Sequence, residues 1–413
     1  MAREMDFVDE CYADKDLSLL KKLTLVIPTY NRNYYLSRCL WYHAHFPFGQ
    51  IIVADSSPEE KKVVNRETVA KVREMFGSDI LYLEYEPETE KYGGDIYRKW
   101  GDAVSHSNTR YTQICTDKEF LMPETLLKCI LFCDGDDGYI GAMGVWYNLT
   151  SSESGLQNMN ITPIDPGNIS LIEDDNPLVR MNDVFMRPQI SAKSLLLCLM
   201  RTDCLKKVHG HYISYNISDI RYGEIFLAYS GYLYGKVKCF KNNIHKIRDE
   251  IAIQRDRATR KAGYINSSES STTRYPAISE YNILDDAKLF ESIYRNAMIN
   301  ELINTVQIPK DRAIIYVQEM MASPLFGKQI GNKNLKSRAS NYWNKYPLIG
   351  VCWRNLPLQV QHIANKFTIF VFKIPLPITS LPTLKIEKNP ETNIINNLII
   401  ETIGDKDNDL PIK

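Results

Sequence analysis

Leu23-Thr24-Leu25-Val26-Ile27-Pro28-Thr29-Tyr30-Asn31-Arg32 is the stretch that decides the fold of this chain. A run of β-forming residues leads into a proline and a polar turn, which is typical of a buried strand that ends at a loop. The apolar stretch over residues 34–46 then has the length and periodicity of a helix. A strand, a turn and a helix in this order predict the opening β-α-β unit of an α/β domain.

Working outward from this unit, short β-branched runs alternate with longer helical stretches as far as about Lys246. Further strands are predicted at residues 50–54, 80–83 and 112–115, and each is bounded by turn formers. This alternation predicts a mainly parallel central sheet flanked by helices.

Composition changes along the chain divide it into segments. Residues 148–181 are rich in Ser, Asn, Pro and Asp and predict an excursion of loops and short strands, while residues 267–275 are dense in Ser and Thr. Helical periodicity returns at residues 281–306 and 311–321. We expect an N-terminal helical extension (1–22), an α/β domain (23–262), a polar linker (263–280), a helical C-terminal region (281–381) and a tail (382–413).

The overall charge excludes some kinds of partner. Among 413 residues, 50 are basic and 50 are acidic, so no net field would attract nucleic acid or an anionic bilayer. Residues 1–16 contain no apolar core of a signal sequence, and we expect a cytoplasmic protein. The nine cysteines are irregularly spaced, which indicates reduced thiols, with Cys129 and Cys133 in a buried core.

The segment over residues 346–381 combines aromatic residues with Pro347, Pro357, Pro375 and Pro377. Because these prolines would interrupt a long helix, they exclude a single membrane-spanning helix here. Two readings stay open, namely a helical pair packed on the α/β domain and a peripheral contact with a membrane at the inner face of the cell.

Three of the predicted strands end in residues suited to a nucleoside diphosphate. Ligands of α/β sheets bind at the carboxyl ends of the strands, where loops and helix N-termini present N–H groups. Tyr30 offers a flat face to a base, and Asp55 can accept a hydrogen bond from a base edge or cap the following helix. Asp117 and Glu119 could hold a ribose hydroxyl and a divalent cation that bridges the phosphates.

These segments resemble the start of the family 2 glycosyltransferases in their order and spacing. The similarity is carried by residues 25–32, by residues 51–57, by Tyr92-Gly93-Gly94 with Arg98-Lys99-Trp100-Gly101, and by the DxD-like run Thr116-Asp117-Lys118-Glu119-Phe120-Leu121-Met122-Pro123. It covers residues 23–255 and implies a GT-A fold that transfers a sugar from a nucleotide-sugar donor, with a UDP-sugar favoured, to a glycan or lipid-linked acceptor with inversion. It further implies a role in bacterial capsule or lipopolysaccharide synthesis.

The resemblance also implies the residues of the site. It places the donor nucleotide at Pro28, Thr29, Tyr30, Arg32, Asp55, Arg98 and Asp117. It implies a Mg²⁺ or Mn²⁺ ion at Asp117, Glu119 and His245. Met186-Arg187-Pro188-Gln189-Ile190 is the segment where we expect the acceptor.

The family's catalytic base is a carboxylate at the start of a helix, followed by a Gly-x-Lys/Arg-Ile/Val strand. Glu224 precedes Gly235-Lys236-Val237-Lys238 and matches the second acid of the family's pair, while Gly223 replaces the first. A carboxylate at a helix start is kept ionised by the helix dipole and can take a proton from the acceptor hydroxyl. Asp219 is the alternative base, and each acid could instead be a helix cap.

Two departures from the family pattern bear on function. Lys118 stands inside the acidic motif and Glu119 closes it, so that a lysine ammonium could do part of the work of a metal. A nucleotidyltransferase is one rival interpretation, although residues 28–32 lack the glycine-rich phosphate loop that it would need. A non-catalytic glycan- or nucleotide-binding protein is the other.

Overall fold

The computed structural model describes residues 12, 16–87, 96–152, 155–164, 171–186, 196–217, 219–249 and 283–322. The strands of these residues are β1 (Leu23–Thr29), β2 (Gln50–Asp55), β3 (Ile80–Glu84), β4 (Tyr111–Ile114), β5 (Glu119–Leu121), β6 (Tyr139–Ser152), β7 (Gly155–Ile164), β8 (Leu199–Arg201) and β9 (Lys236–Asp249). The helices are η1 (Leu17–Lys22), α2 (Asn33–Ala44), α3 (Glu59–Phe76), α4 (Ile96–Ser105), α5 (Pro123–Gly135), η3 (Leu171–Glu173), α6 (Pro177–Met186), α8 (Thr202–Ser214), α9 (Ile220–Tyr234), α11 (Ile283–Glu301), η5 (Leu302–Val306) and α12 (Lys310–Ala322).

The strands form one sheet in the order β3-β2-β1-β4-β8-β6-β9-β5, with β7 paired to β6. The four strands from β3 to β4 run parallel, whereas β8 is antiparallel to both of its neighbours. From β1 the chain builds outward to β2 and β3 and then crosses back to place β4 on the other side of β1. This reversal makes the gap between β1 and β4 a topological switch point, which is where open α/β sheets bind ligands.

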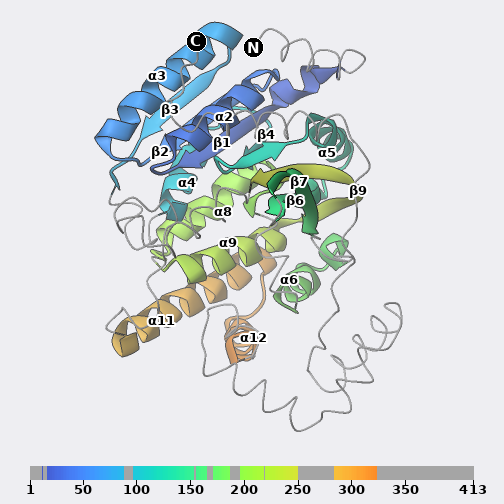
Figure 1. Ribbon diagram of the computed structural model, residues 1–413. Helices are drawn as coiled ribbons and strands as arrows, with labels where there is room; N and C mark the ends of the chain where they lie inside the picture. The colour runs from blue at the N-terminus through green and yellow to red at the C-terminus, as the bar shows by residue number, and fades with distance from the viewer. Residues whose placement is uncertain are drawn as a thin grey trace.

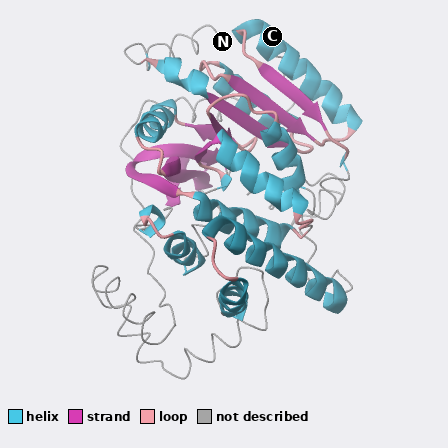
Figure 2. Ribbon diagram, turned by 180° about the vertical axis from the view of Figure 1, so that it is seen from behind, coloured by secondary structure: helices cyan, strands magenta, loops and turns pink. Residues whose placement is uncertain are grey.

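Helices cover both faces of the sheet, as Figures 1 and 2 show from opposite sides. On one face, Leu25 and Ile27 of β1 join a core with α2 and α5, and on the other face Val26 joins a core with α4, α8 and α9. Because both faces are buried, every residue of β1 is buried and the strand is almost continuously apolar.

The helices after residue 283 belong to the second of these cores. Tyr294 of α11 is fully buried and its ring lies 5.3 Å from that of Tyr222 in α9. Val317 of α12 is buried in the same cluster. Figure 1 shows α11 running alongside α9 on the side away from the sheet. The described part of the C-terminal region therefore packs on the sheet domain.

The predicted fold class is confirmed, because the structure is a Rossmann-like α/β sheet flanked by helices, as in the GT-A class. The four predicted strands and the first helix are present, and Cys129 and Cys133 are fully buried. The expectation of loops and short strands at residues 148–181 is wrong in part, because β6 and β7 form a long hairpin. The polar composition suggested loops, but a hairpin satisfies backbone N–H and C=O groups whatever the side chains are.

Several expectations fall outside the described residues. These are the predicted linker over residues 263–280, the aromatic and proline-rich segment over residues 346–381, the tail, and the predicted acceptor segment beyond Met186. Within the described residues, no helix is both long and apolar enough to cross a bilayer.

Two glycines give a matched test of the packing of β6. A Cβ at Gly144 would lie 2.3 Å from the carbonyl oxygen of Asn243 in β9, whereas a Cβ at Gly210 in α8 would meet no atom within 4 Å. We expect Gly144→Ala to lower the free energy of unfolding by about 1–3 kcal/mol, since backbone atoms would have to move. Gly210→Ala should raise it by about 0.5–1 kcal/mol, because alanine favours a helix over glycine. Urea unfolding measures both, and equal effects would contradict the β6–β9 packing described here.

Candidate functional site

The gap between β1 and β4 opens at the carboxyl ends of the two strands. Their pairing stops at Val26 and Ile114, so Pro28 and Thr29 pair only with β2. The chain then turns sharply at Asn31, whose φ of 54° lies in the left-handed region. This turn sends the backbone into α2 and leaves Thr29 facing the loop after β4.

Three of the predicted donor residues meet across this gap. Thr29 Oγ1 donates a hydrogen bond to Asp117 Oδ2 at 2.9 Å, and Arg32 Nη1 donates to Asp117 Oδ1 at 3.1 Å. The Asp117 side chain is 2% exposed and that of Arg32 is 21% exposed. The site therefore has a buried carboxylate that orients an accessible guanidinium. Pro28 and Tyr30 flank Thr29 at the same end of β1.

Lys99 of α4 reaches the same place from the opposite side of the sheet. Its Nζ donates to the carbonyl oxygen of Thr29 at 3.2 Å and to Ser56 Oγ, just after β2, at 2.7 Å. The Lys99 side chain is buried. A second cation is thus fixed at the carboxyl end of β1, next to the Thr29–Asp117 contact.

Asp55 lies at the end of β2 and accepts bonds from three donors. Its Oδ1 accepts from the backbone N–H of Ser57 at 2.7 Å, and its Oδ2 accepts from Asn65 Nδ2 at 2.7 Å and from the Tyr82 hydroxyl at 2.5 Å. Asp55 is fully buried. These bonds join β2 to α3 and β3. Its predicted role toward a base stays a prediction.

Glu119 begins β5 and forms a buried ion pair with β9. Its Oε1 accepts from Lys246 Nζ at 2.9 Å, and its Oε2 accepts from the backbone N–H of Thr116 at 3.0 Å. Burial alone would raise the pKa of Glu119, but Lys246 and Arg248 hold this pKa below its usual value. The Lys246 ammonium also lies 3.8 Å from the centre of the Trp146 ring. Lys118 is buried as well, and its carbonyl oxygen accepts from the N–H of Asp249 at 2.9 Å.

His245, the third predicted metal ligand, is fully buried beside β4. Its Nε2 lies 2.8 Å from Gln113 Nε2, and burial together with the nearby Lys246 lowers the pKa of this imidazole to about 3. Within the described residues, the possible ligand atoms of Asp117, Glu119 and His245 do not all lie within 4.8 Å of one another, as those of a shared metal site would. The structure thus brings Asp117 to Thr29 and Arg32, while Glu119 and His245 have other neighbours.

The side chain of Arg98 and the two candidate bases lie at the turn after α8 and at the start of α9. Arg98 Nη2 donates to Asn216 Oδ1 at 2.5 Å, in the turn that follows α8. Asp219 is buried and accepts from the N–H of Tyr222, so it caps the start of α9. Glu224 follows in the first turns of α9 and is half-buried. A Cβ at Gly223 would lie 2.9–3.0 Å from ring atoms of Tyr212 and Tyr97, so glycine here permits close packing of α9 on α4 and α8.

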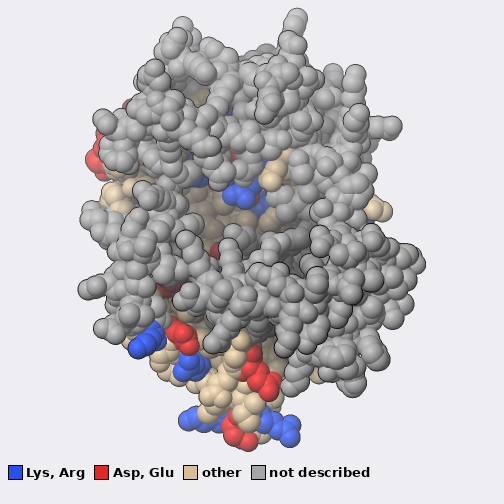
Figure 3. Space-filling model, turned by 60° about the horizontal axis from the view of Figure 1, so that its bottom comes forward, with Lys and Arg blue, Asp and Glu red and all other residues tan. Residues whose placement is uncertain are grey.

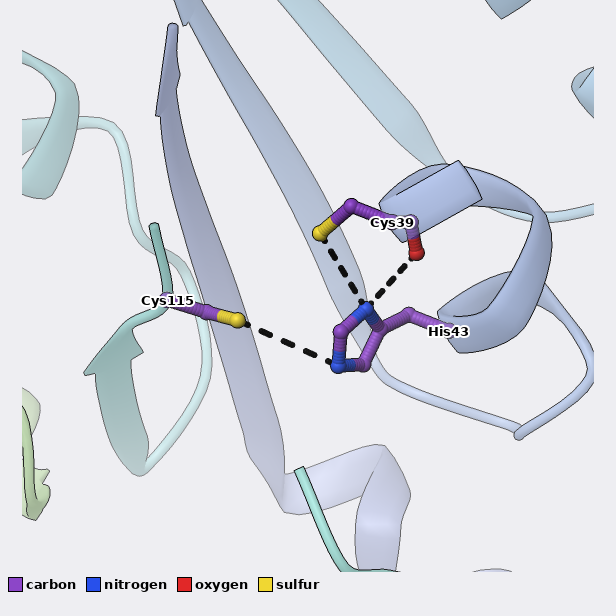
Figure 4. A group of neighbouring side chains, drawn as sticks. All are labelled: Cys39, His43 and Cys115. Carbon is purple, nitrogen blue, oxygen red and sulfur yellow. Dashed lines mark hydrogen bonds between the residues drawn. The ribbon is translucent and has the colours of Figure 1, made fainter. Parts of the chain in front are cut away.

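A cluster of Cys39, His43 and Cys115 lies directly beneath the loop that carries Asp117, and no sequence expectation covered it (Figure 4). His43 Nδ1 lies 2.7 Å from the carbonyl oxygen of Cys39, and His43 Nε2 accepts from the N–H of Leu121 at 3.2 Å. Burial raises the pKa of the Cys115 thiol. Both ring nitrogens thus lie near backbone partners, and Cys115 Sγ lies 3.4 Å from the carbonyl oxygen of Glu119, so the cluster supports this loop through hydrogen bonds.

An open cavity of about 450 Å³ lies beside Asp55, at the end of β3 and the start of α3. It is lined by Glu59, Lys62, Glu84, Tyr85, Glu86 and Pro87. Figure 3 shows the molecule from the end where α12 lies, with some Lys and Arg atoms visible near the middle of the view and both signs of charge at its lower edge.

The sequence itself favours Lys99 over the predicted Arg98 as the basic residue close to the strand ends. Lys99 precedes the buried Ala103 by four residues and so lies on the face of α4 that meets the sheet, whereas Arg98 shares a face with the exposed Asp102. Helical periodicity therefore favours Lys99 over Arg98 as the cation nearest the strand ends. No comparable local pattern in the sequence indicates that Lys246 would be buried and paired with Glu119.

Comparisons with known proteins give a distant structural similarity. No family model matches the chain, and no curated protein matches it. The structure is similar to that of residues 1–349 of S. aureus TarS, with a TM-score of 0.38 and 14% identity over 78% of this chain and 91% of that one. The same fragment in complex with UDP-GlcNAc gives a TM-score of 0.38 and 13% identity over 78% of this chain and 92% of that one. A longer TarS structure gives 0.35 and 14% over 76% of this chain and 53% of that one.

The buried His245 makes the stability of the protein depend on pH. Its imidazole has a pKa of about 3 in the folded protein and about 6.5 in the unfolded chain, so only the unfolded chain binds a proton between these values. The contribution of His245 to stability is complete above pH 6.5 and is lost as the pH falls toward 3, at roughly 1 kcal/mol per pH unit.

Urea unfolding of His245→Asn at a series of pH values measures this contribution, and we expect a shallower pH dependence than in the native protein. The exposed His106 provides the control, since its side chain is 46% exposed. His106→Asn makes the same substitution at an exposed imidazole, and it should change the pH dependence less than His245→Asn does. Identical slopes for native protein and His245→Asn would contradict the burial of a neutral imidazole.

Proposed function

We propose that this chain is an inverting glycosyltransferase of the family 2 type, which moves a sugar from a nucleoside diphosphate sugar to a hydroxyl group of a glycan or lipid-linked acceptor. A UDP-sugar is the favoured donor. Synthesis of a bacterial surface polysaccharide in the cytoplasm, at the inner face of the membrane, is the context that the sequence resemblance favours.

One observation carries this proposal. Arg32 is held at the switch point between β1 and β4, where α/β sheets bind nucleotides, and Lys99 is held at the end of β1 on the side of β2. Arg32 is oriented by the buried Asp117, and α2 begins at the next residue. A guanidinium beside a helix N-terminus is suited to the oxygens of a diphosphate, because both the side chain and the backbone N–H groups attract negative charge.

The chemistry forms one C–O bond, breaks another and transfers one proton. In the proposed reaction, the Glu224 carboxylate takes the proton of the acceptor hydroxyl, and the oxygen attacks the anomeric carbon. The bond between that carbon and the donor phosphate oxygen breaks, and the nucleoside diphosphate leaves with the electron pair. Arg32 and Lys99 offset the charge that develops on it. Asp219, the alternative base, accepts from the N–H of Tyr222 as the cap of α9.

A release assay on Glu224→Gln tests the assignment of the base. In the presence of acceptor, this variant should release nucleoside diphosphate about 10²–10⁴ times more slowly than the native protein, while its affinity for the donor stays the same. Glu67→Gln, which changes an exposed glutamate of α3, is the matched control and should leave turnover unchanged.

The donor must be found first, by thermal unfolding with a panel of UDP-, GDP- and CMP-sugars. A ligand that binds only the folded state raises the melting temperature. If every sugar nucleotide leaves the melting temperature unchanged, the proposed function is wrong. Donor binding with no turnover in native protein on any acceptor would instead favour the non-catalytic binding protein.

A further inference from the structure

The two carboxylates of the acidic motif already have their own cations. Asp117 binds Arg32 through one oxygen and Thr29 through the other, and Glu119 binds Lys246 through one oxygen and the N–H of Thr116 through the other. All four carboxylate oxygens therefore accept at least one hydrogen bond. A divalent cation at this motif would have to share these oxygens with protein donors, two of which are themselves cations.

Displacing Lys246 would be especially unfavourable. Lys246 and Glu119 are each 1% exposed, and the ammonium group lies against the face of the Trp146 ring. A metal ion that took the Glu119 carboxylate would leave a buried ammonium without its counter-ion, and uncompensated buried charges are strongly destabilising. The buried Glu119–Lys246 ion pair therefore disfavours a metal ion at Glu119.

The predicted third ligand also faces elsewhere. His245 Nε2 lies against Gln113, and these three residues do not form a set of converging ligand atoms within the described residues. A site for Mg²⁺ or Mn²⁺ needs several oxygen ligands at about 2.0–2.2 Å from one point. The residues predicted from the DxD-like motif do not fit that requirement.

We propose that the donor diphosphate binds to this protein without a divalent cation, and that Arg32, oriented by Asp117, is the residue that contacts the phosphate oxygens. This inference rests on the proposed function. Asp117 acts here as a positioning residue for the guanidinium rather than as a metal ligand. The guanidinium has a planar fork of N–H donors that matches phosphate oxygens, and the Arg32 side chain is 21% exposed.

Titration calorimetry with UDP and with the sugar nucleotide found in the panel tests the metal dependence of binding. The Kd of the full-length protein should differ by less than about twofold between buffer with excess EDTA and buffer with millimolar Mn²⁺. Electron paramagnetic resonance of Mn²⁺ should show no ion bound to the protein alone. Binding that requires Mn²⁺ overturns the inference and leaves the proposed function standing, whereas no binding in either buffer overturns both.

Variants of Arg32 separate this guanidinium from a general effect of charge. Arg32→Gln should weaken nucleotide binding about tenfold or more in EDTA, since a charge-assisted hydrogen bond is lost, and Mn²⁺ should not restore it. Arg32→Lys keeps the charge but loses the planar fork of N–H donors. Its affinity for the nucleotide should lie between those of the native protein and Arg32→Gln. An Arg32→Gln protein that binds the nucleotide as tightly as native protein overturns the inference.

A double-mutant cycle on the Glu119–Lys246 pair gives a readout independent of nucleotide. Glu119→Gln and Lys246→Met should each lower the melting temperature, and the double variant should unfold at a higher temperature than either single variant, because no buried charge is left unpaired. If Glu119→Gln alone leaves the melting temperature unchanged, Glu119 is not committed to Lys246 and the inference is wrong.

Discussion

The structure around the candidate site depends on the burial of carboxylates, which must be paired with cations. Asp117, Glu119 and Asp249 are each at most 2% exposed, and each forms an ion pair at 2.8–3.1 Å. A buried charge without a partner costs several kcal/mol, so each of these carboxylates requires a basic side chain at a fixed place. Those basic side chains come from α2, from Arg32 directly before it, and from β9, which is far away in the chain.

This requirement ties together the loop after β4, the first helix and the last strand of the sheet. Arg38 of α2 pairs with Asp249 at the end of β9, and Lys246 of β9 pairs with Glu119 at the start of β5. Beneath the loop, His43 accepts from the N–H of Leu121. The loop is therefore held from three sides before any ligand binds. Such preorganisation lowers the cost of orienting Arg32 toward an anion.

The sequence was a good guide to local structure and a poor one to long-range pairing. Apolar runs bounded by turn formers located β1, β2 and β4, because a strand buried on both faces must be apolar whatever its partners are. The partly buried β3 was located by the same kind of run. The burial of Lys99 could also have been read from the periodicity of α4. The pairing of Glu119 with Lys246 could not be predicted in this way. It depends on the antiparallel register of β5 with β9, in which Leu121 faces Lys246. The hairpin of β6 and β7 was missed because much of its pairing lies in a polar stretch of the sequence, where strand pairing leaves no apolar pattern.

The structure also changes the meaning of two positions, Gly223 and Lys118, at which the chain differs from the family 2 pattern. Gly223 stands where an acid was expected, and the structure gives it a packing role, because a side chain there would collide with Tyr97 and Tyr212. The backbone of Lys118 holds the end of β9 through its carbonyl oxygen, and Asp249 in turn pairs with Arg38. Neither residue needs to be a trace of lost activity. Each is accounted for by the packing that fixes the loop and α9 in place, so the departures leave the arrangement of Thr29, Arg32 and Asp117 intact.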